Sequence, residues 1–228
     1  MSQFPKNFYM QFRKYINRIF IRNPDSFFKK IDGIIHIGAN VGQERLYYQK
    51  CGLLVIWVEP IPRVFDQLVE NISVIPGQVA YQYLLTDSND KDYEFNIAGE
   101  SGESSSIYDL AEHRDIWPTI EYTDSIRLRG STLEAMIDRE GVDINKYQGL
   151  VLDTQGSELL VLQGARNILR QFSYIKLEAW DFNAYDGCCQ MDELIAYLKQ
   201  FHFYEKKRSK FAEHPGGGGC YDLIFYRK

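Results

Sequence analysis

An apolar segment, a glycine turn and a second apolar segment ending in an acid stand near the start of the chain. Residues 34–37 are mostly apolar and run directly into a turn over 38–42. A second apolar run over 53–58 leads to Glu59 and Pro60. A glycine turn lets a ligand approach the backbone, and an acid at the end of the second strand accepts ribose hydroxyls. This order favours a Rossmann-type parallel sheet that holds a nucleoside.

The glycine spacing distinguishes between two kinds of nucleoside. A dinucleotide site needs glycines where this chain has Gly38, Asn40 and Gln43, and the second glycine here is Gly42 instead. S-adenosylmethionine has no pyrophosphate, so it does not need that spacing. The acid Glu59 follows Gly38 by 21 residues, the usual interval for a ribose ligand. We therefore predict an S-adenosylmethionine site, and a Rossmann-like domain without a ligand is the alternative.

The predicted cofactor contacts extend beyond the turn and the acid. Pro60 and Ile61 would cover one face of the adenine. Asp87 would accept a hydrogen bond from the adenine amine, or it is a turn residue at a strand end. The complete predicted set is His36, Gly38, Ala39, Asn40, Gly42, Gln43, Glu59, Pro60, Ile61, Asp87, Ser105, Ser106 and Asp153.

Composition limits the classes of partner. The 228 residues suffice for one α/β domain with a full core, and the net charge of −5 argues against a nucleic-acid partner. The four cysteines fit neither a zinc site nor a disulfide framework, which predicts a reducing cytoplasm. No apolar run approaches the roughly 18 residues of a transmembrane helix, and charges interrupt the N-terminus where a signal peptide would be apolar.

The first 30 residues differ from the rest. They contain seven basic residues and one acid, and apolar side chains recur at helical spacing over 4–22. We predict a basic amphipathic helical extension over 1–30 and a catalytic domain over 31–228. Packing on its own domain or on a second subunit is the simplest interpretation of this helix. Peripheral contact with an anionic membrane is the alternative.

The remaining pattern alternates between strands and helices. Strands are predicted over 33–38, 53–58, 79–85, 149–153 and 174–179, and helices over 42–50, 62–73, 132–140, 157–171 and 190–200. Alternation of this kind indicates a parallel sheet with helices on both faces. Two final strand patterns flank a glycine turn over 216–219 and predict an antiparallel hairpin. Ser131 and Glu134 suggest a capping box, and residues 99–130 are predicted to be a long irregular segment.

Several motifs together resemble the FkbM family of methyltransferases, from about Ile31 to the C-terminus. They are the turn with Glu59-Pro60, the run 104–107, the run 131–134, Asp153-Thr154-Gln155-Gly156-Ser157-Glu158 with Leu162-Gln163-Gly164-Ala165, and the run 175–178. The resemblance implies the class I methyltransferase fold, with a mostly parallel seven-stranded sheet. It also implies S-adenosylmethionine-dependent methyl transfer, most often to a hydroxyl. Two departures stand out: His36 replaces a usual Asp, and Gln155 replaces a usual Glu.

Four residues are candidates for the chemistry. Asp153 and Glu178 end neighbouring strands, where ligands bind in open α/β sheets. Glu158 is a third candidate, or it stabilises a helix N-terminus. His113, in the long segment, is a candidate base or an exposed loop residue. The acids need no metal, although oxygen ligation of Mg²⁺ or Ca²⁺ is an alternative.

The predicted activity is O-methylation of a sugar or glycan precursor, as in surface polysaccharide or glycolipid biosynthesis. Three alternatives remain at this stage. The acceptor is a lipid or secondary metabolite, the domain binds without catalysis, or the enzyme uses NAD. The spacing of Asn40 and Gln43 disfavours the last of these.

Overall fold

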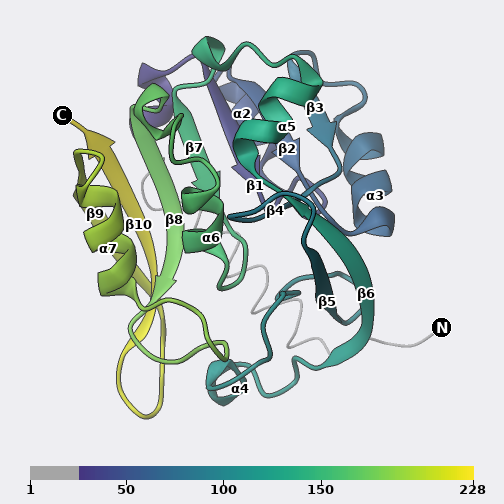
Figure 1. Ribbon diagram of the computed structural model, residues 1–228, viewed down its shortest axis with the longest axis vertical. Helices are drawn as coiled ribbons and strands as arrows, with labels where there is room; N and C mark the ends of the chain where they lie inside the picture. Colours follow the sequence, from purple (N-terminus) through teal and green to yellow (C-terminus); the bar gives the residue numbers. More distant parts are fainter. Residues whose placement is uncertain (1–25) are drawn as a thin grey trace.

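The structure, a computed structural model, describes residues 26–228 and places an open, twisted sheet at the centre of the fold (Figure 1). The predicted helix over 4–22 lies outside the described residues. Within them the strand order is β3-β2-β1-β7-β8-β10-β9. The first five strands in this order are parallel, and β10 is antiparallel to both β8 and β9. This confirms the predicted mostly parallel seven-stranded sheet with a C-terminal antiparallel hairpin.

The strands of this sheet follow the apolar runs of the sequence. They are β1 (Gly33–Ile37), β2 (Leu54–Val58), β3 (Gln78–Tyr81), β7 (Gly149–Leu152), β8 (Tyr174–Trp180), β9 (Phe203–Glu213) and β10 (Gly219–Arg227). All residues of β1 and β7 are buried, as expected for parallel strands covered on both faces. The strand order reverses at β1, because β2 lies on one side of it and β7 on the other. Open α/β sheets form ligand crevices at the carboxyl ends of the strands at such a point.

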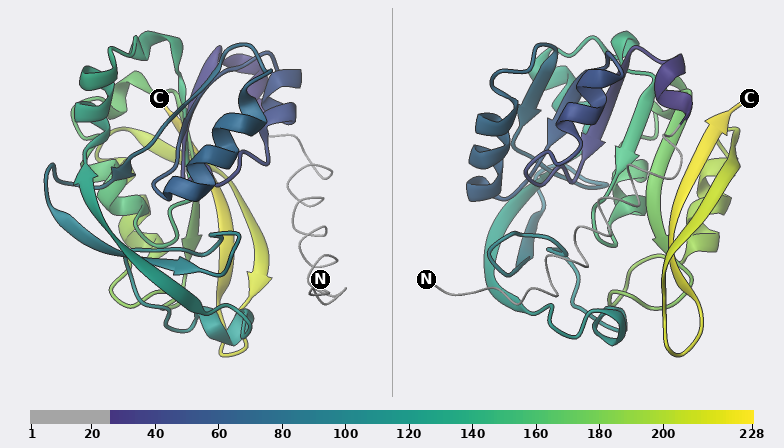
Figure 2. Two further views of the ribbon diagram at one scale, coloured as in Figure 1. Left: turned by 90° about the vertical axis from the view of Figure 1, so that its right-hand side faces the viewer. Right: turned by 180° about the vertical axis from the view of Figure 1, so that it is seen from behind.

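Helices cover both faces of the sheet (Figure 2). On one face lie α2 (Arg45–Lys50) and α3 (Pro62–Ile72), and on the other lie α5 (Leu133–Glu140), α6 (Glu158–Gln163) and α7 (Met191–Lys199). Short 3₁₀ segments occupy Ser26–Lys30, Ile144–Lys146 and Leu169–Gln171. Phe27 and Phe28 from the first of these are buried in the core beside Tyr48 and Trp57, so the core extends N-terminal to residue 31.

A second, smaller sheet corrects one prediction. The segment 99–130 was expected to be irregular, but β6 (Tyr122–Ser131) pairs antiparallel with β5 (Asp92–Ala98). A short strand, β4 (Leu84–Leu85), pairs with the end of β6, so the predicted strand over 79–85 is two strands in two sheets. The apolar side of this small sheet packs on the start of α3, through Phe95, Ile97 and Val64.

Two helix predictions also change. The capping box at Ser131 is wrong because α5 begins one residue later: Thr132 Oγ1 accepts the N–H of Ala135, and Glu134 accepts the N–H of Asn167. The helix predicted over 157–171 ends at Gln163. At the next residue, Gly164, a Cβ would stand 2.0 Å from the carbonyl oxygen of Thr86, so the chain here passes directly against the residue that follows β4.

Candidate active site

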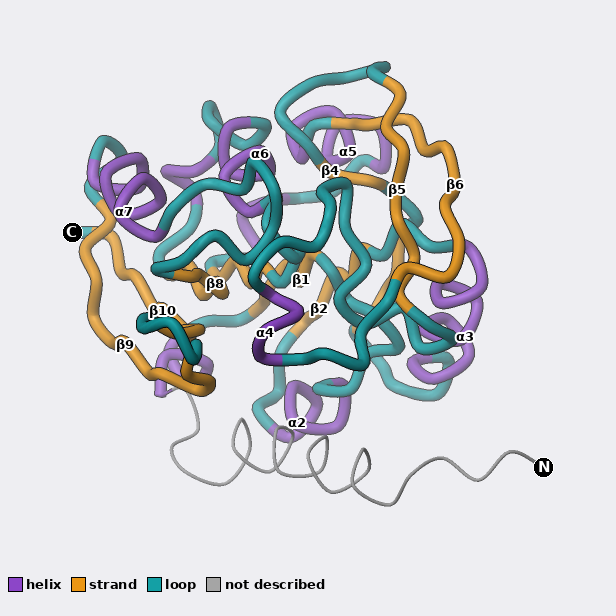
Figure 3. The backbone as a smooth tube through the Cα atoms, turned by 90° about the horizontal axis from the view of Figure 1, so that it is seen from below, coloured by secondary structure: helices purple, strands orange, loops and turns teal. Residues whose placement is uncertain are grey.

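A cavity of about 500 Å³ opens at the carboxyl ends of the parallel strands. Its inner wall comes from the residues that follow β1, β2 and β7, together with the end of β8. Its outer wall comes from residues 102–105, from the short helix α4 (His113–Ile116) with residues 117–120, and from Phe211 and Ala212. In Figures 1 and 3, α4 lies beyond the strand ends, across the mouth of the sheet.

The turn after β1 lies directly against the end of β7. Gly38 has φ +79°, and a Cβ there would stand 1.8 Å from the carbonyl oxygen of Asp153. The N–H groups of Gly38 and Ala39 both donate to the carbonyl of Val58, at 3.0 Å. The main chain therefore fixes the inner wall of the cavity, and glycine is required where the two strand ends meet.

The side chain of Glu59, which directly follows β2, binds the main chain of this turn. Its carboxylate accepts the N–H of Asn40 and the N–H of Ile61, both at 2.9 Å. The residue is 4% exposed, and burial raises its pKa to about 7. Each carboxylate oxygen has a further lone pair, so these backbone bonds leave acceptor capacity for two hydroxyls on the cavity side.

Apolar side chains line the cavity beside Glu59. Pro60 and Ile61 lie in the lining as predicted, and Leu84, Leu85 and Phe95 join them. Asp87 does not lie there. It is exposed, and it accepts hydrogen bonds from the hydroxyls of Ser88 and Tyr93. The turn role is therefore the one the structure supports, and the adenine contact is corrected.

Two further predicted cofactor contacts, Ser106 and Gly42, also lie behind the cavity surface. Ser105 lines the cavity, but Ser106 does not: its hydroxyl donates to the carbonyl of Gln155 and accepts the N–H of Tyr108. Gly42 faces the core, where a Cβ would meet Leu68 at 2.8 Å. Both residues support the walls without facing the space a ligand would fill.

His36 and Gln43 do line the cavity. The Nδ1 atom of His36 lies 3.2 Å from the Tyr48 hydroxyl, and its ring stacks on Trp57. Burial lowers the pKa of His36 to about 3, so its imidazole is neutral at physiological pH. The Gln43 amide donates to Asn40 Oδ1 at 3.2 Å, which supports the turn.

Asp153 and Glu178 face the same cavity from β7 and β8. Asp153 accepts a hydrogen bond from the Gln155 amide, and burial raises its pKa to about 6. Glu178 is 8% exposed. The structure therefore brings together two of the acids that the sequence singled out, on adjacent strands.

Glu158 is not part of this group. It is fully buried outside the cavity lining, where its carboxylate accepts the N–H groups of Thr154 and Gly156 at 2.8 and 3.0 Å. It also accepts the Thr154 hydroxyl. The catalytic role is corrected, because the carboxylate is committed to the loop before α6 and does not face the ligand space.

His113 lies in the outer wall, in α4, and is 3% exposed. Its ring contacts Trp117 and Tyr185, with centroids 4.5 and 5.1 Å away. Its Nδ1 atom is buried and has no hydrogen-bond partner among the described residues. Burial lowers its pKa to about 4, so its imidazole is neutral at physiological pH and can accept a hydrogen bond.

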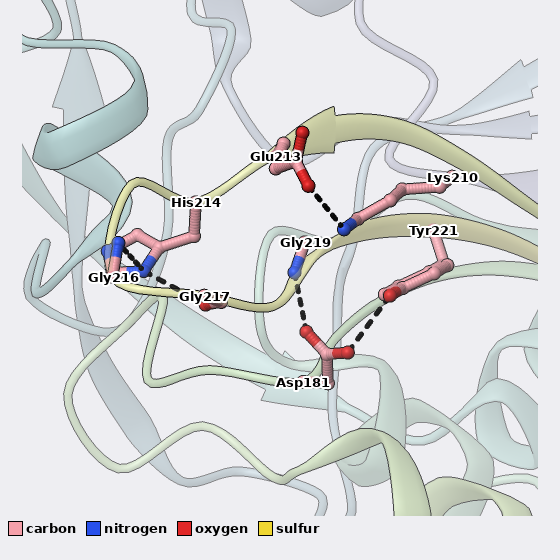
Figure 4. Close-up of polar contacts among 8 residues, drawn as sticks. All are labelled: Asp181, Lys210, Glu213, His214, Gly216, Gly217, Gly219 and Tyr221. Carbon is pink, nitrogen blue, oxygen red and sulfur yellow. Dashed lines mark hydrogen bonds and ion pairs between the residues drawn. The ribbon is translucent and has the colours of Figure 1, made fainter.

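The turn between β9 and β10, drawn in Figure 4, also contacts the outer wall. His214 stacks on Phe182, and its Nε2 atom lies 3.1 Å from Asp115 and 3.5 Å from Glu112, at the start of α4. On the other side of the turn, Asp181 accepts the N–H of Gly219 and the Tyr221 hydroxyl (Figure 4).

Sequence reasoning missed two acids of the cavity. Glu44 immediately precedes α2 and Glu103 lies in the loop before α4, and burial raises the pKa of each to about 7. No local pattern marks either residue, since each faces the cavity only because of the path of its loop. Among the described residues, no group of three or more His, Cys, Asp or Glu side chains is arranged to hold a metal ion.

Comparison with known families agrees with this geometry. Residues 36–205 match the methyltransferase FkbM domain. The chain belongs to the FkbM methyltransferase family. It is an S-adenosylmethionine-dependent methyltransferase, which confirms the predicted family and cofactor. No curated protein sequence matches the chain.

Solved structures similar to this FkbM protein share little sequence with it. An uncharacterized protein from Listeria monocytogenes serotype 4b has a TM-score of 0.51 at 10% identity, over 99% of this chain and 69% of that one. This is a likeness of fold. Magnesium protoporphyrin IX methyltransferase from Synechocystis PCC 6803 with bound SAM has a TM-score of 0.49 at 9% identity, over 100% and 86% of the two chains. A SAM-dependent methyltransferase from Aquifex aeolicus has 0.48 at 10%, over 98% of each.

The described residues fit the cofactor of the family. The volume is within the range of small-molecule sites, and Glu59 presents acceptors for the ribose beside an apolar wall for the base. The absence of a side chain at Gly38 leaves the turn in direct contact with the end of β7, where Asp153 stands. In the described part of the chain, no helix is both long and apolar enough to cross a bilayer.

Proposed function

We propose that this methyltransferase transfers the methyl group to a hydroxyl of a sugar or glycan precursor. One observation carries the proposal: a single cavity joins the Glu59 turn to Asp153, Glu178 and His113, three groups that can bind a hydroxyl. An acceptor that enters between these groups would meet the cofactor at the switch point of the sheet.

The chemistry requires orientation and a proton acceptor. When bound, S-adenosylmethionine supplies the methyl group on a leaving sulfur. Asp153 accepts the hydroxyl proton as the acceptor oxygen forms its bond to the methyl carbon and the carbon–sulfur bond breaks. Its raised pKa of about 6 leaves the carboxylate largely ionised at pH 7 and more basic than an ordinary Asp. Glu178 and His113 accept hydrogen bonds from the acceptor and orient it.

The outer wall supports a ring-shaped acceptor. Trp117, Trp180 and Phe211 present aromatic surface to the cavity, and Glu178 and His113 add polar groups beside them. Aromatic faces pack on the apolar faces of sugar rings while polar groups bind the hydroxyls. This mixture of aromatic and polar groups favours a sugar.

A second acceptor class has its own support. Ile116, Ile120 and Phe211 make part of the outer wall apolar. A lipid or secondary-metabolite hydroxyl would use this surface for burial. The two acceptor classes share the role of Asp153 and differ in what fills the outer part of the cavity.

Methyl transfer from radiolabelled cofactor tests the proposal. Nucleotide sugars, lipid-linked sugars and sugar-free lipid alcohols would be offered to the full chain, and labelled product would be identified by chromatography. We expect Asp153→Asn to retain cofactor affinity within about threefold and to lose roughly 10²–10⁴-fold in turnover. The wild-type rate should fall as pH drops through about 6, because a protonated Asp153 cannot accept the proton.

Three outcomes would contradict parts of this proposal. Product from the sugar-free alcohols alone would replace the glycan acceptor with a lipid. Wild-type turnover in Asp153→Asn would remove the base. Cofactor binding with no product from any acceptor would favour the noncatalytic alternative.

A further inference from the structure

The cavity has two chemically different ends along the inner wall. Beside Glu59 it is apolar, formed by Ile61, Leu84, Leu85 and Phe95. On the other side of Gly38, toward β7, it is polar, formed by His36, Gln43, Glu44 and Asp153. S-adenosylmethionine has the same asymmetry, with an adenine at one end and a charged amino-acid tail at the other. A ribose bound to Glu59 and a base on the apolar side direct the amino-acid tail toward the polar end.

The α-ammonium group of that tail needs a negative partner, and the end of β1 does not supply one. The ring of His36 is neutral, and its Nδ1 atom and one face are already engaged by Tyr48 and Trp57. Glu59 is engaged by the N–H groups of Asn40 and Ile61 at the ribose position. The negative charge at the polar end of the cavity must therefore come from another element.

Glu44 has the required position. It follows the glycine turn, immediately precedes α2 without a capping hydrogen bond from its side chain, and lines the cavity together with Gln43. No Lys or Arg forms an ion pair with it among the described residues. Burial is the largest effect that raises the pKa of Glu44, and Asp153 raises it further, whereas the Glu44 main chain, Lys176 and Arg45 lower it. Two partly buried carboxylates near each other repel, and a cation bound between them relieves that repulsion.

The pKa of the other missed acid, Glu103, is also raised by Asp153, but the loop that carries it is held at the adenosine side of the cavity. Its neighbour Gly102 packs against the apolar side, where a Cβ would stand 3.1 Å from both Ile61 and Val64. The carbonyl of Ser101 in the same loop accepts the Asn40 amide, which places this loop over the turn and the adenosine side. Glu103 thus provides a matched comparison within one cavity.

We propose that the Glu44 carboxylate binds the α-ammonium group of S-adenosylmethionine. Glu44 is then a cofactor-binding residue that holds the amino-acid tail and leaves the proton transfer to Asp153. The ammonium group relieves the repulsion between the two carboxylates, so tail binding also keeps Asp153 ionised next to the acceptor.

Titration calorimetry with two ligands tests this assignment. S-adenosylhomocysteine carries the amino-acid tail, and 5′-methylthioadenosine has the same adenosine and sulfur without it. We expect Glu44→Gln to weaken S-adenosylhomocysteine at least tenfold and to leave 5′-methylthioadenosine within twofold of wild type. Glu59→Gln should weaken both ligands by similar factors, since both contain the ribose.

Glu103→Gln is the matched control, the same chemical change in the same cavity. It should change the two affinities by one common factor. The proposal is overturned if Glu44→Gln weakens both ligands equally, if it weakens neither, or if Glu103→Gln is the variant that separates them. A thermal unfolding midpoint close to wild type, measured without ligand, shows that a variant is folded before its affinities are compared.

Discussion

The inner and outer walls of the cavity are built in opposite ways. The inner wall consists of strand ends joined by main-chain contacts, such as Gly38 against the carbonyl of Asp153. The outer wall consists of residues 102–105, α4 with its following loop, and the end of β9. Side chains such as His214 and Asp115, which are 99 residues apart in sequence, support it from behind. In the proposed function the first wall binds the cofactor and the second binds the acceptor.

This difference explains why the sequence identifies the family but does not identify the acceptor. Main-chain contacts tolerate few sequences, so the inner wall carries a recognisable motif. Side-chain contacts between distant segments admit many combinations, and the loops that make them are the usual place for specificity. The family is therefore evident from the inner wall, and the acceptor depends on the outer wall.

The largest predicted effect comes from breaking the inner wall at Gly38. Gly38→Ala places a Cβ onto the carbonyl of Asp153 in a left-handed backbone conformation, and we expect a loss of roughly 3–5 kcal/mol in unfolding free energy. Gly52→Ala is the control: its φ is also positive, but no atom lies within 4 Å of the new Cβ. Denaturant unfolding should show a loss of about 1–2 kcal/mol there. Equal losses in the two variants would mean that the contact with Asp153 is unimportant.

A smaller effect is expected where the inner wall continues into α6. Glu158→Gln weakens the bonds to Thr154 and Gly156 in a fully buried site, which should reduce the unfolding free energy by about 2 kcal/mol. Turnover by the folded fraction should stay within a fewfold of wild type. If Glu158→Gln were as stable as wild type but had lost turnover, the result expected for Asp153→Asn, Glu158 would have a catalytic role after all.

The smallest effect concerns the outer wall and depends on pH. Hydrogen bonding to Asp115, with Glu112 nearby, raises the pKa of His214. A raised pKa in the folded state stabilises the protein at low pH, and this stabilisation is lost as pH rises through the folded pKa. Unfolding of His214→Asn should therefore show a larger deficit at pH 5.5 than at pH 8.5. Cofactor affinity should not change, because His214 lies outside the cavity. A deficit independent of pH would show that stacking on Phe182, and not charge, holds the turn.

Much of the inner wall could be predicted from the sequence, because each part is a local pattern with a physical cause. Gly38 and Glu59 stand at fixed intervals around apolar strands. Glu158 was misassigned because a carboxylate in the first turn of a helix accepts the N–H groups of the preceding loop as readily as it faces a ligand. The sequence spacing between Asp153 and Glu158 is compatible with either role, so it does not distinguish them.

Long-range pairing explains the remaining failures. Ile126 and Leu128 alternate with charged residues in β6, which is a strand signal, but the neighbouring acids and glycines favoured an irregular segment. His113 was treated as a loop residue, although its burial comes from Trp117 and Tyr185, the latter 72 positions away. Glu44 carries no local signal, because its exposure to the cavity follows from the path of the turn before α2.

The contact between Gly38 and the carbonyl of Asp153 also fixes the distance between the cofactor-binding turn and the proposed base. The glycine turn proposed to bind the methyl donor and the main chain of Asp153, the proposed proton acceptor, are in direct contact. Backbone dimensions do not vary with side-chain identity. Substitutions in α4 or in the β9–β10 turn can therefore change which molecule enters, while the spacing between donor loop and base stays constant. One catalytic spacing can thus serve a succession of different acceptors.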